Sequence, residues 1–100
     1  MIHVVTGHIC SGKSTHVREH AKAADVVIDL DRIAVALAVE GTGHHDYPQH
    51  ITEIARAARW YAMDKAVALH RQGGFDVWII HAYPSPADLA IYRRIDARIM

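Results

Sequence analysis

The feature that most constrains this chain is a glycine-rich octapeptide close to its N-terminus. It reads Gly7-His8-Ile9-Cys10-Ser11-Gly12-Lys13-Ser14. Residues 2–6 before it are mostly β-branched and apolar, which predicts a short buried strand. Residues 13 to about 24 after it are helix formers. The glycines exclude regular structure between the two, so we expect a tight turn that joins a strand to a helix.

The octapeptide has the spacing G-x-x-x-x-G-K-[ST], and each fixed position has a chemical role. Glycines let successive backbone N–H groups point into one anion-sized nest, at which the following helix aims the positive end of its dipole. Lys13 supplies a charge for the β- and γ-phosphates, and the Ser14 hydroxyl is a ligand for Mg²⁺. The alternative is an ordinary glycine-rich turn with an exposed lysine. The predicted nucleotide-binding residues are Gly7, His8, Ile9, Cys10, Ser11, Gly12, Lys13, Ser14 and Thr15.

The rest of the sequence alternates short apolar runs with segments of helical spacing. Further strands are predicted at 26–28, 75–81 and 95–100, and helices at 13–24, 32–39, 49–72 and 85–94. The buried stripe of the long helix is predicted to be Ile51, Ile54, Ala58, Tyr61, Ala62 and Leu69. This alternation implies a parallel sheet with right-handed crossovers and helices on both faces. The predicted fold class is α/β in three layers, with residues 1–100 as one domain.

Composition and charge restrict the class of protein. The 11 basic and 11 acidic residues balance, so the net charge does not require nucleic acid or an anionic membrane as partner. Cys10 is the only cysteine, which rules out an intrachain disulfide and favours a reducing compartment. The first residues lack the pattern of a signal peptide, and no apolar run approaches the about 20 residues of a membrane span. We therefore expect a cytoplasmic protein without a membrane partner.

Two carboxylates follow the second predicted strand. Asp29 and Asp31 are placed at its carboxyl end, which faces the ligand site in a parallel sheet. Strand alternation puts both on one side while Leu30 faces away. A carboxylate there can accept a proton from a substrate hydroxyl or hold Mg²⁺ through water. We predict Asp31 as the catalytic base and Asp29 as a metal-binding residue; the alternative is that Asp31 only caps the next helix.

Other residues near this edge have more than one interpretation. The third strand ends in His81, without the acid that organises Mg²⁺ in many nucleotide-binding enzymes. Tyr83 just beyond it is a candidate for stacking on a base. Arg56 and Arg59 are neighbours on one helix face, which we expect to be solvated; contact with a phosphate is the alternative. Residues 41–48 are predicted to form a polar loop.

Two segments carry a family resemblance: Val4 to Thr15 (VVTGHICSGKST) and Val26 to Ala34 (VVIDLDRIA). They resemble the P-loop kinases of the group that includes polynucleotide kinases, and they look most like the small kinase-like ATPases of bacteriophages. The resemblance implies a P-loop NTPase fold with sheet order 2-3-1-4. It also implies transfer of phosphate from ATP, with Mg²⁺, to a hydroxyl of a nucleoside or nucleic acid. Asp31 matches the base of that group, and Lys13 its catalytic lysine.

The resemblance ends with the fourth strand. Members of the group continue to an arginine-bearing lid helix and a fifth strand, whereas this chain ends at Met100. We expect the last strand to leave an open edge that pairs with a second copy or with a partner chain. The missing lid arginines and the missing acid of the third strand favour another function: a shortened protein that binds nucleotide or a protein partner without turnover. Lys13, Ser14 and Asp31 favour phosphate transfer.

Overall fold

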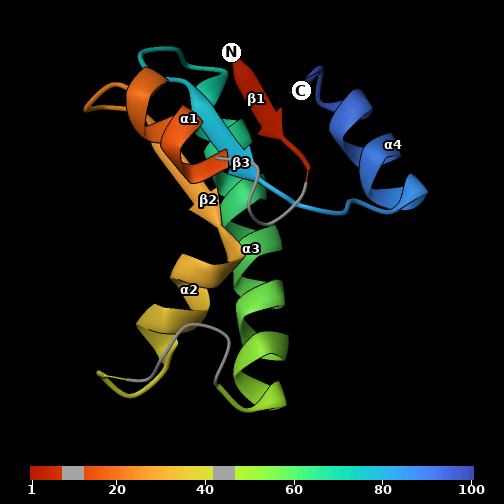
Figure 1. Cartoon of the computed structure of the whole chain (residues 1–100). Coiled ribbons are helices and arrows are strands. Elements are labelled where there is room, and N and C mark those ends of the chain that lie inside the picture. Colours follow the sequence, from red (N-terminus) through yellow and green to blue (C-terminus); the bar gives the residue numbers. More distant parts are fainter. Residues whose placement is uncertain (8–12, 42–46) are drawn as a thin grey trace.

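A parallel four-stranded sheet forms the centre of the molecule (Figure 1). The structure is a computed structural model that describes residues 1–7, 13–41 and 47–100. In chain order its elements are β1 (Ile2–Val5), α1 (Lys13–His20), β2 (Val26–Asp29), α2 (Leu30–Leu37), α3 (Gln49–His70), β3 (Val77–Ile80), α4 (Pro86–Arg94) and β4 (Arg98–Ile99). The predicted alternation of strands and helices is confirmed.

The strands follow the order β2-β3-β1-β4, and all neighbours are parallel, which confirms the expected order. The register aligns one residue from each of the longer strands, because Val4 of β1 and Ile28 of β2 both lie opposite Ile79 of β3. All three side chains are buried. This row of branched apolar residues across the sheet is typical of parallel strands that are covered on both faces.

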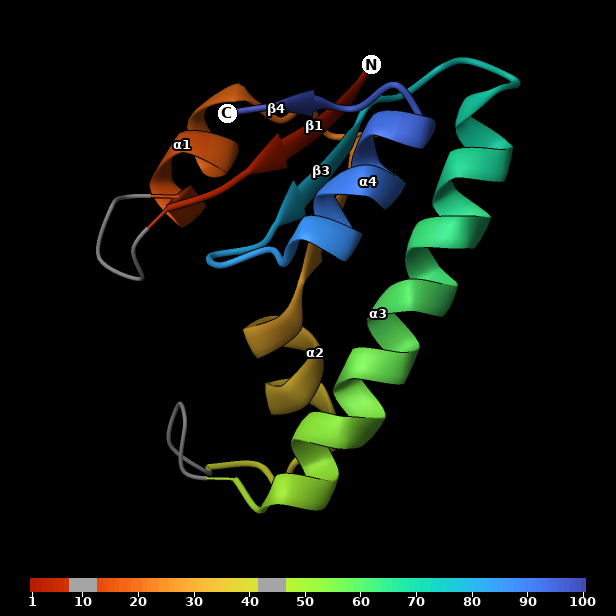
Figure 2. The same ribbon diagram turned by 90° about the vertical axis from the view of Figure 1, so that its right-hand side faces the viewer.

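Strand alternation divides the core between the two faces of the sheet. One face packs against α3 and α4 and contains Ile2, Val4, Ile28, Met63, Ala66, Val67, Val77, Ile79 and Tyr92. The other face packs against α1 and contains Val5, Val17, Trp78 and Ile80. Figure 2 shows α1 and α3 on opposite sides of the sheet. The molecule therefore has the predicted three layers.

The long helix α3 turns a different face to the core than predicted. Its buried residues are Ala55, Arg59, Met63, Ala66 and Val67, whereas the predicted Ile54, Tyr61 and Leu69 are exposed. Apolar residues occur on all sides of this helix, so their spacing does not fix its rotation. The first half of α3 extends beyond the sheet, where it packs against α2 (Figure 2). Within the described ranges, no helix combines the length and apolarity needed to cross a lipid bilayer.

The first helix ends earlier than predicted because Asp25 organises the turn that follows it. α1 stops at His20. The carboxylate of Asp25 accepts hydrogen bonds from the backbone N–H of Lys22 at 2.9 Å and from that of Asp76 at 2.9 Å. It also accepts from the indole N–H of Trp78 at 3.0 Å. One aspartate thus ends α1 and joins the start of β2 to β3.

The last strand is shorter than predicted and spans only Arg98–Ile99. Asp96 has a φ of 58°, a left-handed conformation that turns the chain from α4 back to the sheet. Both backbone groups of Met100 form hydrogen bonds with the chain segment of β1 and the residue after it. Its N–H donates to the carbonyl of Val4 at 2.8 Å, and its carbonyl accepts from the N–H of Thr6 at 2.9 Å. The backbone groups of the preceding residue in β4 therefore face away from β1.

The connections that leave β1 and β3 cover opposite faces of the sheet. β1 leads to α1 on one face, and β3 leads to α4 on the other. Because the two strands are neighbours, their carboxyl ends form a topological switch point, the place where open α/β sheets bind ligands. The N–H of Gly7 donates to the carbonyl of Ala82 at 3.1 Å, which joins the two chain segments just beyond the strands.

Candidate functional site

The predicted phosphate-binding turn begins and ends at the switch point. Gly7 follows β1 with a φ of 121°, a conformation that glycine adopts readily. Lys13 is the first residue of α1, and Thr15 is exposed in its first turn. His8, Ile9, Cys10, Ser11 and Gly12 lie outside the described residues, as do the side chains of Lys13 and Ser14. The described part therefore gives the two ends of the turn, a strand on one side and a helix on the other.

Asp29, and not Asp31, caps the second helix. Asp29 is the last residue of β2, and its Oδ1 accepts a hydrogen bond from the backbone N–H of Asp31 at 3.1 Å. The helix consequently starts at Leu30, two residues before the prediction. Leu30 and Asp31 belong to a helix, so strand alternation does not apply to them. The argument that placed the two aspartates on one side of a strand therefore fails. Asp29 is the N-cap, and Asp31 is the second residue of the helix.

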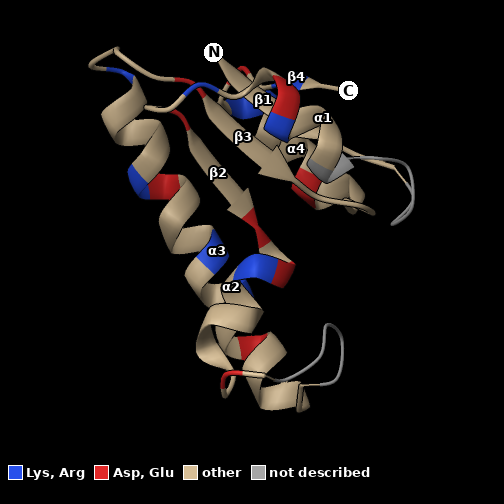
Figure 3. Cartoon of the chain, turned by 60° about the vertical axis from the view of Figure 1, so that its left-hand side comes forward, with Lys and Arg blue, Asp and Glu red and all other residues tan. Residues whose placement is uncertain are grey.

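The two aspartates form an acidic pair at the carboxyl edge of the sheet, next to the basic Arg32 (Figure 3). Burial raises the pKa of the Asp29 carboxyl above its ordinary value, and the nearby charge of Asp31 acts in the same direction. The backbone N–H of Asp31 and the charge of Arg32 act against this shift. Mg²⁺ binds through one or two carboxylates together with phosphate oxygens. Two neighbouring carboxylates fit this demand in their ionised form.

Tyr47 contacts the predicted base, and the sequence did not reveal this contact. Its hydroxyl donates to Oδ1 of Asp31 at 3.1 Å, although the two residues are 16 positions apart. The contact joins the start of α2 to the segment just before α3. The only signal in the sequence is an aromatic residue, followed by Pro48, in a loop that is otherwise polar. This hydrogen bond orients the carboxylate that we predicted as the base.

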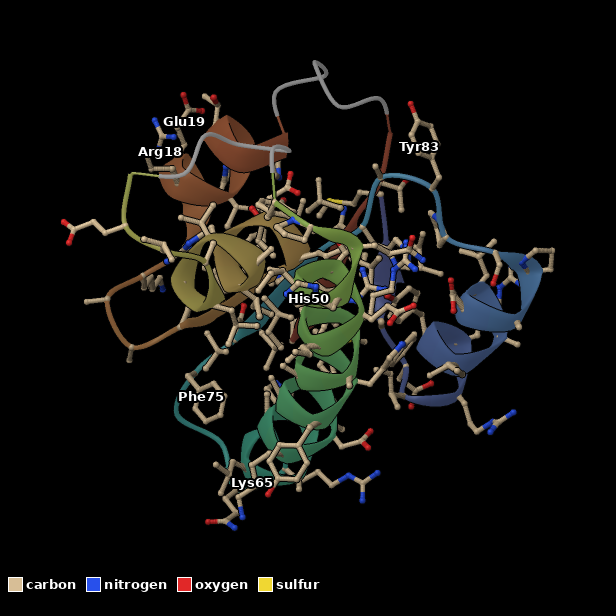
Figure 4. All side chains as sticks on the ribbon, turned by 90° about the horizontal axis from the view of Figure 1, so that it is seen from below. Arg18, Glu19, His50, Lys65, Phe75 and Tyr83 are labelled. Atoms are coloured by element: carbon tan, nitrogen blue, oxygen red, sulfur yellow. The ribbon has the colours of Figure 1, made fainter. Side chains whose placement is uncertain are left out.

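A groove of about 380 Å³ opens on the α1 face of the sheet, beside Asp29. Its lining residues are Val17, Arg18, Ala21, Val27, Asp29, Arg32 and Ile80. The volume lies within the range of about 300–1,000 Å³ that is common for small-molecule sites. Figure 4 views the molecule from the carboxyl end of the sheet and shows Arg18 projecting outward from α1. The groove thus combines an apolar floor with one acid and two guanidinium groups, a lining suited to a phosphorylated or hydroxylated organic ligand.

A second polar cluster lies at the end of β3. The ring Nδ1 of His81 is 2.6 Å from the hydroxyl of Tyr92. Tyr92 is a residue of α4, and it is completely buried. The ring Nε2 of His81 is 3.7 Å from Oδ2 of Asp88, also in α4. The acid that the third strand lacks is therefore near its end, but it comes from the next helix. Tyr83, the candidate for stacking on a base, is 63% exposed and points away from the body of the molecule (Figure 4).

The cluster at the end of β3 is uncharged at His81 and Tyr92 near neutral pH. Burial lowers the pKa of the His81 ring, the positive charge of Arg59 lowers it further, and Asp88 acts against both. Burial raises the pKa of the Tyr92 hydroxyl to about 12. A neutral histidine presents one nitrogen as donor and the other as acceptor. The pair therefore forms a neutral hydrogen bond next to a permanent cation.

Arg59 contradicts the prediction of a solvated face on α3. It is 6% exposed, whereas Arg56, three residues earlier, is exposed as expected. Arg59 lies on the buried stripe between Ala55 and Met63, each four positions away. Its guanidinium carbon is 5.5 Å from the ring centre of Trp60. Its Nε is buried and has no hydrogen-bond partner among the described residues.

No protein-family model, no curated protein and no solved structure matches the chain. We therefore base the functional inference on the residues of this chain and on the arrangement of its described part.

Proposed function

We propose that this chain is a phosphotransferase that uses ATP and Mg²⁺ to phosphorylate a hydroxyl group of a nucleoside or nucleic acid. One observation carries the proposal. The G-x-x-x-x-G-K-S octapeptide joins β1 to α1 at the switch point of a parallel sheet, since Gly7 follows the strand and Lys13 starts the helix. Backbone N–H groups and a helix N-terminus at this location favour a bound polyphosphate.

The residues of the octapeptide bind the donor. The backbone N–H groups of residues 8–15 surround the phosphates, and the ammonium of Lys13 neutralises the β- and γ-phosphates. The hydroxyl of Ser14 and the carboxylate of Asp29 are the proposed ligands of Mg²⁺, which when bound neutralises charge on the transferring phosphoryl group. Because Asp29 also caps α2, its position is fixed by the backbone of Asp31.

Asp31 is the proposed base. Its carboxylate takes the proton from the acceptor hydroxyl while that oxygen bonds to the γ-phosphorus and ADP leaves. The hydrogen bond from Tyr47 supports this role because it holds the carboxylate in one orientation. The groove beside Asp29 has the size of a nucleoside site and lies at the same edge of the sheet.

One observation favours a second function, nucleotide binding without turnover. β3 ends in Ile80 and continues with His81, so no carboxylate of this strand stands next to the phosphate-binding turn. Without that carboxylate the charge of the transferring phosphoryl group is less well balanced. Binding and turnover must therefore be measured separately.

Binding is tested by calorimetric titration of Mg-ATP into the wild-type chain and into Lys13→Ala. We expect saturable binding that disappears in the variant, because the lysine charge and the phosphates are in direct contact. Absence of binding to the wild type at millimolar Mg-ATP would show that the octapeptide is not a nucleotide site.

Turnover is tested with γ-labelled ATP and nucleoside or oligonucleotide acceptors. We expect Asp31→Asn to lower the transfer rate by about 10²–10⁴-fold while Mg-ATP affinity is retained, the usual effect of losing a general base. Asp64→Asn, a change at an exposed position of α3, is the matched control. A full rate in Asp31→Asn would remove this residue as the base, and binding without transfer to any acceptor would establish the second function.

A further inference from the structure

Arg59 is a buried cation that lies over the ring of Trp60 but has no ion pair in the described part of the chain. Arginine is almost never this buried unless it is paired, because the desolvation of a guanidinium is costly. The ion pairs in the described part of the chain do not include Arg59. Its buried Nε has no hydrogen-bond partner there either. A buried donor without an acceptor requires an explanation, and a bound anion is one that would also supply a counter-charge.

Asp88, the acid whose pKa Arg59 lowers, is already engaged in hydrogen bonds. Oδ2 of Asp88 accepts the backbone N–H of Ser85 at 3.0 Å, and the backbone N–H of Asp88 donates to the Ser85 hydroxyl at 3.1 Å. These bonds form the capping box of α4. Asp88 is close enough for its charge to be felt by Arg59, but it makes no ion pair with it in the described structure. His81 and Tyr92, on which the charge of Arg59 also acts, are bonded to each other.

The location of Arg59 determines which anion can reach it. Its charge acts on His81, the first residue after β3, and on Asp88 and Tyr92 of α4. Ala82 follows His81 in the chain, and its carbonyl accepts the N–H of Gly7, where the phosphate-binding turn begins. Arg59 therefore lies on the α3–α4 side of the switch point, across the sheet from the groove beside Asp29.

We propose that Arg59 binds a phosphoryl group of a substrate held at the carboxyl ends of β1 and β3. The guanidinium presents several N–H donors in a plane, a geometry that matches phosphate oxygens, and Nε–H is one of those donors. A phosphate would give the buried N–H its acceptor and the cation its counter-charge in one step. The identity of the phosphate as part of a nucleotide follows from the proposed function. Its source is either the γ-phosphate of the donor or a phosphate already carried by the acceptor.

The Nε–H of Arg59 is a direct reporter of this contact in ¹⁵N-labelled wild-type protein. Because the group is buried, we expect a resolved resonance in the arginine Nε region, which is assigned by its loss in Arg59→Met. The spectrum is recorded during separate titrations with inorganic phosphate, Mg-ATP, Mg-ADP and a nucleoside 3′-monophosphate. We expect inorganic phosphate and one of the nucleotides to shift the resonance in a saturable manner.

The substitution gives the second measurement. We expect Arg59→Met to weaken inorganic phosphate binding by at least about tenfold, the effect of losing a hydrogen bond between charged groups. Arg56→Met removes an exposed arginine one turn away on the same helix and is expected to leave the affinity unchanged. We also expect Arg59→Met to raise the Tm, because an apolar side chain of similar length replaces an unpaired buried charge.

The outcomes distinguish a phosphate of the donor from one of the acceptor. They also distinguish failure of this inference from failure of the proposed function. A shift with Mg-ATP but not with Mg-ADP assigns Arg59 to the γ-phosphate, and a shift with the 3′-monophosphate assigns it to the acceptor. If Mg-ATP binds by calorimetry and none of the four compounds moves the Arg59 resonance, the inference is overturned while the proposed function stands. If inorganic phosphate moves it but Mg-ATP does not bind, the anion site stands and the proposed function does not.

Discussion

At the scale of single residues, hydrogen bonds between distant segments hold the amino-terminal end of the sheet together. Asp76, just before β3, accepts a hydrogen bond from the Met1 ammonium at 2.7 Å, and its other oxygen is 2.9 Å from Nε2 of His3. These two contacts, the first being the larger effect, lower the pKa of the Asp76 carboxyl to about 2. β1 and β3 are thus joined by a charged contact at one end and by Gly7 and Ala82 at the other.

The low pKa of Asp76 predicts a contribution to stability that depends on pH. Because the folded-state pKa lies below the ordinary 3.8, the carboxylate stabilises the fold above that pH, and its contribution is lost as the pH falls from 3.8 towards 2. We expect Asp76→Asn to lower the free energy of unfolding near neutral pH but not near pH 2. Urea unfolding of both proteins across this range measures the difference. A deficit that persists at the acid end would show that the carboxylate charge is not its cause.

Tyr47 is predicted to matter for turnover and not for donor binding. Tyr47→Phe removes the hydroxyl that donates to Asp31 but keeps the ring. We expect the transfer rate to fall by about tenfold, the worth of one hydrogen bond to a charged group, with unchanged Mg-ATP affinity. Tyr61→Phe, at a 74% exposed position of α3, is the control. An unchanged rate in Tyr47→Phe would mean that this contact does not position Asp31 for chemistry.

Sequence reasoning reached those site residues whose pattern is local. The octapeptide and its flanking strand and helix were predictable because its glycines, lysine and serine occur at fixed spacing. Tyr47 and Arg59 were not, because their neighbours come from segments that only the fold brings together. The pair Asp29 and Asp31 lies between these cases. Either residue suits a helix cap, and the propensity for capping does not choose between candidates two positions apart.

At the scale of elements, α4 and α3 show the same contrast. The start of α4 was predicted correctly because serine, proline and an acid occur together within four residues, and the capping box is present as expected. The rotation of α3 was predicted wrongly. Its buried stripe includes Arg59 and excludes Tyr61. Which side of α3 is buried depends on how the helix packs against the sheet and α2. Capping is a local property, whereas the buried face of a helix that is apolar on several sides depends on its neighbours.

The capping box predicts a measurable contribution of Ser85 to stability. Ser85→Ala removes the side chain that accepts the N–H of Asp88 at the start of α4. We expect the free energy of unfolding to fall by about 1 kcal/mol, measured by urea unfolding. Ser85→Asn keeps a capping side chain and should stay close to the wild type. Equal losses in both variants would point to a role of the serine other than capping.

At the scale of the whole molecule, the sheet exposes β2 and β4 as its two edges. The order of strands was expected from the family resemblance and not from the residues themselves, because the predicted crossovers fix the handedness of the connections but not this order. The length of β4 was not, because the apolar character of its segment continues while Asp96 and Ala97 are used to turn the chain. A strand of two residues with the exposed Arg98 has features that weaken pairing between edges.

Association of two chains through β4 remains a prediction with a direct test. Light scattering across the micromolar range measures the molecular mass of the wild type and of Ile99→Pro. The backbone N–H of Ile99 faces away from β1, so proline removes a donor on the open side of the strand. A dimer that the substitution weakens would establish pairing through this edge. A monomer at every concentration would exclude pairing through this edge.

The division of the core into two faces also places one tryptophan on each side of the sheet. Trp60 packs with the α3–α4 face, next to Arg59 and 6.2 Å from the ring of Tyr92. Trp78 faces α1 and stacks on His3 at 3.8 Å. The tryptophan fluorescence of the chain is therefore the sum of two emitters that sense different surroundings. Trp78→Phe leaves an optical signal from the face on which Arg59 lies, and Trp60→Phe leaves one from the face that α1 covers, without any added label.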